Sequence, residues 1–106
     1  MVSLSAMIKL AQKSPYRNWR HAAIVFRGGA VVSMATNTHN LHAEIRALNK
    51  VKYKHNLSLL SIRVNKNGEL RLAYPCQDCM AYLQEHNVQI LLYSTETGEI
   101  KREKVE

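Results

Sequence analysis

Apolar residues recur at intervals of three and four through the first segment of the chain. They are Leu4, Met7, Ile8 and Ala11. This spacing puts side chains on one face of a helix, so it predicts an amphipathic helix that ends before Ser14. Lys9 and Lys13 lie four residues apart and fall on the opposite side of that helix.

A strand pattern begins at His21. The runs Ala22 to Phe26 and Ala30 to Met34 are apolar and rich in β-prone residues, and Arg27-Gly28-Gly29 separates them. A short glycine-rich turn between two such runs predicts an antiparallel hairpin. The second strand of this hairpin should run out near Ala35-Thr36-Asn37.

Three later segments also have strand character: Leu57 to Val64, Ile90 to Thr95 and Glu99 to Val105. An extended stretch with Leu70, Leu72 and Tyr74 follows the first of them. The three residues Glu96-Thr97-Gly98 join the last two strands. A parallel crossover needs roughly a dozen residues, so these two strands should pair antiparallel.

Two further helices are predicted between the strands. The first should run from His42 to about Tyr53, with Asn40 as its N-cap. The second should have Pro75 at its first helical position, where the missing N–H costs nothing, and its two cysteines should point inward. After the first helix the elements follow in the order β-β-α-β-α-β-β. This order predicts an α/β fold with a mixed five-stranded sheet covered by helices.

The length and composition indicate one compact domain over residues 1–106. The chain is 46% hydrophobic and 22% charged, which is typical of a globular protein and not of a disordered one. No apolar run approaches the ~18 residues of a membrane span, and the amino terminus does not resemble a signal peptide. We therefore expect a cytoplasmic protein without a membrane partner.

The chain carries a formal net charge of +7. Such a charge favours a phosphate-bearing partner, either a nucleotide or a polynucleotide. It is equally compatible with lysines that only keep a small protein in solution, because no long basic run stands out. The charge alone does not choose between these interpretations.

Two short motifs carry the candidate chemistry. His42-Ala43-Glu44 supplies an imidazole and a carboxylate, and Pro75-Cys76-Gln77-Asp78-Cys79 supplies the only two thiols of the chain. One imidazole and two thiolates can hold a zinc ion and leave a fourth position for water. Zinc lowers the pKa of a bound water, and Glu44, which is not a ligand, could take the proton of that water. Each motif lies at a predicted helix start, where free N–H groups favour thiolates.

The pair H-x-E and P-C-x-x-C, in this order, is the signature of zinc nucleobase deaminases. On these motifs the chain resembles the zinc-dependent cytidine deaminase-like superfamily over nearly its whole length. The resemblance implies a three-layer α/β/α fold and a Zn²⁺ cofactor held by His42, Cys76 and Cys79. It also implies that Glu44 shuttles protons and that the backbone of Ala43 contacts the base.

Three further residues are candidate substrate contacts. Asn37 occupies the place where members of this family commonly use an asparagine to hold the sugar or base, although it could simply be a turn residue at a strand end. His21 stands at a place that can border the pocket in this family, and an exposed histidine at a strand start is the alternative. Tyr93 could stack on a base or could be partly buried packing.

The motifs leave the substrate open. The closing hairpin is similar to that of the free-nucleoside cytidine deaminases, whereas the run from His42 to Leu48 is similar to that of the tRNA-adenosine group. Tyr74 replaces the serine or the glutamate that these two groups place before the proline. We expect hydrolytic deamination of cytosine to uracil in a free (deoxy)cytidine nucleoside or nucleotide.

Other interpretations remain. The charge and the residues Tyr16, Arg17, Trp19 and Arg20 suggest a deaminase of single-stranded DNA or RNA, in which they form a stacking and phosphate-binding edge. The alternative role of Tyr16 and Trp19 is to anchor the first helix against the sheet. His39 could be a fourth ligand, which would close the site and make the protein a non-enzymatic zinc-stabilised binding module. The Cys76-x-x-Cys79 pair could also be a redox pair, although its surroundings do not resemble thioredoxin. In each case we expect a homo-oligomer, because a domain this small often needs a neighbour to complete a pocket.

Overall fold

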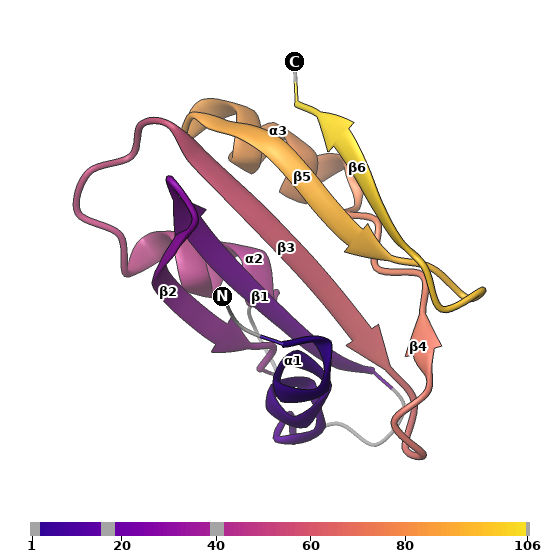
Figure 1. The fold of residues 1–106 in the computed structure, drawn as a ribbon. Helices are drawn as coiled ribbons and strands as arrows, with labels where there is room; N and C mark the ends of the chain where they lie inside the picture. The colour runs from indigo at the N-terminus through magenta and orange to yellow at the C-terminus, as the bar shows by residue number, and fades with distance from the viewer. Residues whose placement is uncertain (1–2, 16–18, 39–41, 106) are drawn as a thin grey trace.

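The structure is a computed structural model that describes residues 3–15, 19–38 and 42–105. Its elements in chain order are α1 (Leu4–Gln12), β1 (Arg20–Arg27), β2 (Ala30–Thr36), α2 (Ala43–Asn49), β3 (Leu57–Val64), β4 (Leu70–Arg71), α3 (Gln77–Glu85), β5 (Val88–Ser94) and β6 (Ile100–Lys104) (Figure 1). Apart from the additional short strand β4, the order of strands and helices is the one that the sequence predicts.

The strands form one mixed sheet in the order β2-β1-β3-β5-β6. β3 and β5 are parallel, and the other pairs along this path are antiparallel. The prediction that the last two strands pair antiparallel is confirmed, with Ile90 opposite Lys104. The sheet has six strands and not five, because the short β4 pairs with the end of β3 at Arg63 and Val64.

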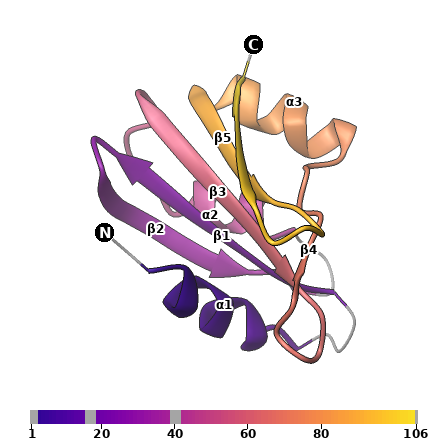
Figure 2. The same cartoon turned by 45° about the vertical axis from the view of Figure 1, so that its right-hand side comes forward.

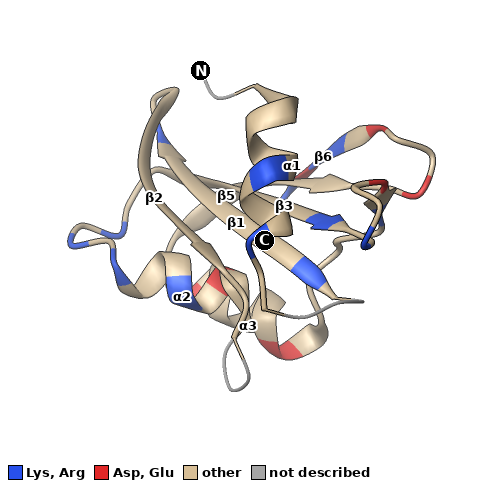
Figure 3. Ribbon diagram, turned by 90° about the horizontal axis from the view of Figure 1, so that it is seen from below, with Lys and Arg blue, Asp and Glu red and all other residues tan. Residues whose placement is uncertain are grey.

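Helices cover both faces of the sheet. α1 lies on one face, and α2 and α3 lie on the other, as Figure 2 and the view from below in Figure 3 show. The side chains of β1 alternate accordingly: Ala22 and Ile24 join the core beneath α1, whereas Ala23 and Val25 join the core beneath α2 and α3. The predicted α/β fold with a mixed sheet is therefore confirmed.

The first hairpin has the predicted glycine turn. β1 ends at Arg27 and β2 begins at Ala30, so Gly28 and Gly29 form a two-residue loop. Their φ angles are +58° and +85°, which suit the type I′ turns that match the twist of a hairpin. The turn pairs Arg27 with Ala30, the register shifts between Val25 and Phe26, and Ala22 then pairs with Thr36 at the far end of the hairpin.

The ends of two helices differ from the predicted ones. α2 begins at Ala43 with His42 as its N-cap, and it ends at Asn49 because the chain then turns to bury Val51 in the core. α3 begins at Gln77, so Pro75 lies before the N-cap and not at the first helical position. The sulfur of Cys76 accepts a hydrogen bond as the cap, which explains this shift. Asn40 lies outside the described residues.

Lys and Arg are spread over helices, strands and loops, as Figure 3 shows. The net charge therefore does not mark one interface by itself. None of the helices among the described residues is long and apolar enough to cross a membrane.

Candidate metal centre

Three potential metal ligands converge where α2 and α3 begin. The ligand atoms of His42, Cys76 and Cys79 all lie within 4.8 Å of one another. The Sγ atom of Cys79 is 3.1 Å from Nδ1 of His42, and the backbone N–H of Cys79 donates to Sγ of Cys76 at 3.5 Å. Both cysteines are free. An imidazole and two sulfurs gathered in this way can hold a metal ion.

Local structure explains how these side chains meet. His42 and Cys76 both have extended backbone angles at N-cap positions, so each side chain projects from the start of its helix. Helices α2 and α3 lie on the same face of the sheet and contact each other. Cys79 lies in the first turn of α3. The expectation that both cysteines point inward is wrong for Cys76, because Cys79 is buried and Cys76 is exposed as a cap.

The Cys79 sulfur needs a nearby cation to become a thiolate. Burial is the main cause that raises the pKa of the Cys79 thiol well above its usual range, and the nearby charge of Glu44 raises it further. A positive ion at the cluster would offset both effects, because it stabilises the thiolate. The residues present therefore fit a cation bound between them.

Glu44 is the second buried group of the site. Its side chain is 1% exposed, and its Oε1 has no hydrogen-bond partner among the described residues. A buried carboxylate oxygen without a partner is costly, so natural proteins retain one chiefly where it serves a ligand or a reaction. The charge of Glu44 acts on the Cys79 thiol, so this carboxylate lies near the three ligands.

His21 stands beside Glu44 on strand β1. Its Nδ1 is 3.5 Å from Oε1 of Glu44, and its Nε2 is 2.6 Å from the hydroxyl oxygen of Ser61. Burial lowers the pKa of His21, and the charge of Glu44 opposes this effect without cancelling it. The ring is therefore neutral near pH 7. With its proton on Nδ1, it would donate toward Glu44 and accept from Ser61.

The other predicted contacts are placed as follows. Ala43 is fully buried at the start of α2. Tyr93 is half-buried on β5, and its ring packs edge-to-face against Tyr74 with centroids 5.0 Å apart. Both belong to the α2 and α3 side of the molecule, since Tyr93 packs against the core cluster beneath these helices. Their roles toward a substrate stay predictions.

Asn37 holds the backbone that leads into β1. Its Oδ1 accepts hydrogen bonds from the Ser14 hydroxyl at 2.5 Å and the His21 N–H at 3.2 Å, and its Nδ2 donates to the Trp19 carbonyl at 2.7 Å. These bonds engage both ends of the amide. The predicted contact with sugar or base stays a prediction, whereas the support of the segment before His21 is a feature of the structure.

Two residues near the site were not singled out from the sequence, Ser61 and Arg63 of β3. They continue the alternation of Leu57 and Leu59, which bury their side chains in the core beneath α2 and α3. Polar residues on the inward side of an apolar strand are the signal that could have found them. His39, Tyr16 and Arg17 fall outside the described residues.

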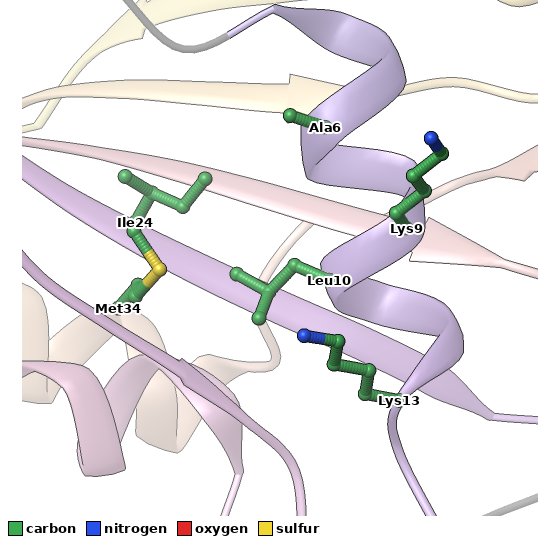
Figure 4. Close-up of a pocket in the computed structure, with 6 residues that line it drawn as sticks. All are labelled: Ala6, Lys9, Leu10, Lys13, Ile24 and Met34. Atoms are coloured by element: carbon green, nitrogen blue, oxygen red, sulfur yellow. The ribbon is translucent and has the colours of Figure 1, made fainter.

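A shallow apolar groove lies on the opposite side of the sheet. It runs between α1 and β2 and is lined by Ala6, Lys9, Leu10, Lys13, Ile24 and Met34 (Figure 4). Because α1 covers the face that α2 and α3 do not, this groove is separated from the metal cluster by the sheet. It is not part of the candidate site.

No protein-family model matches the chain, and no curated protein matches it.

Proposed function

We propose that the protein is a zinc-dependent deaminase that converts cytosine to uracil in a (deoxy)cytidine nucleoside or nucleotide, on a cytidine deaminase-like α/β/α fold. The observation that carries the proposal is Glu44, whose buried Oε1 has no hydrogen-bond partner among the described residues and lies near a cluster of one imidazole and two sulfurs. An acid and base next to a metal with an open position is the arrangement that hydrolytic deamination needs.

Zinc is the ion that suits this donor set. Tetrahedral bonds of about 2.3 Å to sulfur and about 2.1 Å to nitrogen would put the three ligand atoms about 3.6 to 3.8 Å apart. The described cluster, with atoms within 4.8 Å and one pair at 3.1 Å, needs only small side-chain adjustments to reach such spacing. When bound, zinc would supply the Lewis acid that makes water a nucleophile near neutral pH.

The chain's own residues would do the proton work. The reaction consumes water and releases ammonia, so one proton must leave the water and protons must reach the ring nitrogen and then the departing amine. Glu44 can carry out both transfers from Oε1, which accepts no hydrogen bond from the described residues and is shielded from solvent. The ring of His21 restricts the rotation of that carboxylate, because Ser61 holds the imidazole beside it.

The base would enter between the cluster and the aromatic side chains of Tyr74 and Tyr93. Edge-to-face packing fixes Tyr93, and the hydroxyl of Tyr74 donates to the Glu103 carboxylate at 2.6 Å. Two rings held in this way can form a pocket wall for a flat heterocycle. The exposed Tyr74 replaces the small or acidic residue that related motifs carry, so it is expected to shape the choice of substrate.

The proposal is tested by a substrate panel with zinc-loaded protein. Cytidine, deoxycytidine, their monophosphates and triphosphates, adenosine, and single-stranded DNA and RNA are each incubated with the protein, and ammonia and the deaminated base are measured. Uracil products are expected, with no inosine from adenosine. Absence of any deaminated product from every cytosine substrate would contradict the proposal, and a zinc site with four protein ligands would favour the binding module.

Assembly as a homo-oligomer belongs to the same proposal. It rests on the size of the domain, since a neighbour could cover the open side of the pocket near the exposed His42 and Cys76. Size-exclusion chromatography with light scattering would measure it. A monomeric mass at the concentrations that support turnover would contradict this part.

A further inference from the structure

Arg63 stands on the same sheet face as the candidate site. On β3 it is directly opposite His21 of β1 on one side and Arg71 of β4 on the other. Residues opposite each other in an antiparallel pair have Cβ atoms about 5 Å apart and project to one face. His21 in turn lies 3.5 Å from Glu44. His21 is therefore the common neighbour of Arg63 and Glu44, the group that would handle protons.

The guanidinium of Arg63 is fixed in place but incompletely bonded. It lies 3.6 Å from the ring centroid of Trp19, in a cation–π contact. Trp19 itself is 58% exposed, so the stack faces solvent. The Nε of Arg63 is buried without a hydrogen-bond partner among the described residues. A buried guanidinium donor without an acceptor indicates that an anionic ligand completes it.

The charges around Arg63 also favour an anion. Arg71, its cross-strand neighbour, carries the same charge, and like charges in directly opposite positions repel. Burial is the main cause that lowers the pKa of Arg63, Arg71 lowers it further, and Glu96 acts in the opposite direction. Glu96 is exposed, so it balances this positive region only in part.

We propose that Arg63, held by Trp19, binds the phosphate next to the cytosine that enters the Glu44 site. This inference rests on the proposed function and narrows it: the preferred substrate is a cytosine nucleotide, and a free nucleoside is turned over less efficiently. The planar fork of arginine can bind two phosphate oxygens at once, which a single ammonium cannot match. The phosphate can belong to a free nucleotide or to the backbone of a single strand, and the test separates the two sources.

The first test compares kcat/KM for cytidine, its 5′-monophosphate and a short single-stranded oligonucleotide with one cytosine. Arg63→Gln should lower kcat/KM about tenfold or more for phosphate-bearing substrates and leave cytidine unchanged. Arg63→Lys should recover part of the loss because it keeps the charge and the stem. Lys52→Gln is the matched control, because it removes the same positive charge at an exposed position. Lys52 lies in the loop before the start of β3, whereas Arg63 lies near the end of that strand.

The monophosphate and the oligonucleotide distinguish the sources of phosphate. A loss with the monophosphate assigns the subsite to a free nucleotide, and a loss confined to the oligonucleotide assigns it to a strand. The inference would be overturned if Arg63→Gln lowered kcat/KM equally for cytidine and for the phosphate-bearing substrates. It would also be overturned if neither Arg63→Gln nor Arg63→Lys lowered kcat/KM for any substrate.

A second measurement does not need turnover. Trp19 is the only tryptophan of the chain, so intrinsic fluorescence reports on the Arg63 stack. The monophosphate or the oligonucleotide should change this fluorescence in the wild type and not in Arg63→Gln, and cytidine should change it in neither. If this response occurs without turnover of any cytosine substrate, the proposed function fails and the phosphate subsite stands. If there is no response to either phosphate-bearing ligand, the subsite is refuted whatever the turnover.

Discussion

The Nδ1 atom of His21 lies 3.5 Å from Oε1 of Glu44, although the two residues come from strand β1 and helix α2. The imidazole of His21 contacts this carboxylate through Nδ1 and the hydroxyl of Ser61 through Nε2. The contact joins the sheet to the helix that begins at the metal cluster. Several measurable properties depend on it.

The pH dependence of stability should show the buried state of His21. Burial lowers its pKa in the folded protein below the value of 6.5 for an exposed histidine. The unfolded chain therefore takes up a proton at this residue below about pH 6.5 when the folded protein does not, and stability falls as the pH falls through that range. His21→Gln should flatten this part of a plot of melting temperature against pH.

His55→Gln is the control for that comparison, because His55 is exposed. The plot of melting temperature against pH for His55→Gln should match that of the wild type. Identical profiles for His21→Gln and wild type between pH 5 and 7 would contradict the account of a buried neutral histidine.

Ser61→Ala should destabilise the fold. Ser61 is fully buried, and its removal would leave Nε2 of His21 without its partner inside the protein. The expected loss in the free energy of unfolding is about 1 to 2 kcal/mol, measured by urea denaturation. Ser58→Ala, a change on the same strand at a partly exposed position, should cost less. Equal costs for the two variants would show that the hydrogen bond to His21 contributes nothing.

Metal removal should lower the melting temperature. An ion held by His42, Cys76 and Cys79 would tie the starts of α2 and α3 together, and a ligand that binds only the folded state stabilises it. A chelator should therefore shift the wild type downward and leave His42→Ala unchanged. A chelator that shifts both proteins equally would show that these three side chains do not form the binding site.

Asn37→Ala should loosen the segment that carries Trp19 and His21. Its side chain makes the three hydrogen bonds that connect Ser14, Trp19 and His21. A loss of about 2 kcal/mol in the free energy of unfolding is expected. Gln89→Ala, which removes only one long contact at an exposed position, is the control. If stability is unchanged and only KM rises, Asn37 serves substrate and not the scaffold.

The order of helices and strands could be predicted because the apolar periods differ clearly between segments. β3 runs from Leu57 to Val64 as predicted. Helix ends were less predictable, since they depend on caps. The sulfur of Cys76 caps α3, so the helix begins at Gln77 and not at Pro75 as predicted. Strand β4 has only two residues, which is too short to show an alternation of apolar and polar positions. Its pairing with β3 depends on tertiary contact.

The convergence of His42, Cys76 and Cys79 could be predicted from sequence because these residues lie at fixed spacings within two short motifs. Of the surroundings of Glu44, only His21 was a candidate from the sequence, through the family resemblance; Ser61 and Arg63 were not, because they come from a distant strand. His21, Ser61 and Arg63 meet only through the register of β1 and β3, which no local pattern specifies. The support of His21 by Ser61 and the stack of Arg63 on Trp19 therefore became visible only in the fold.

The most direct test of the account is a paired measurement of zinc content and cytosine deamination in Glu44→Ala. Glu44 is proposed to move protons and not to bind metal, so the variant should retain one zinc per chain and lose turnover by at least about a hundredfold. Glu85→Ala, an exposed change at the end of α3, should keep both properties. Full retention of turnover in Glu44→Ala with zinc still bound would contradict the central claim.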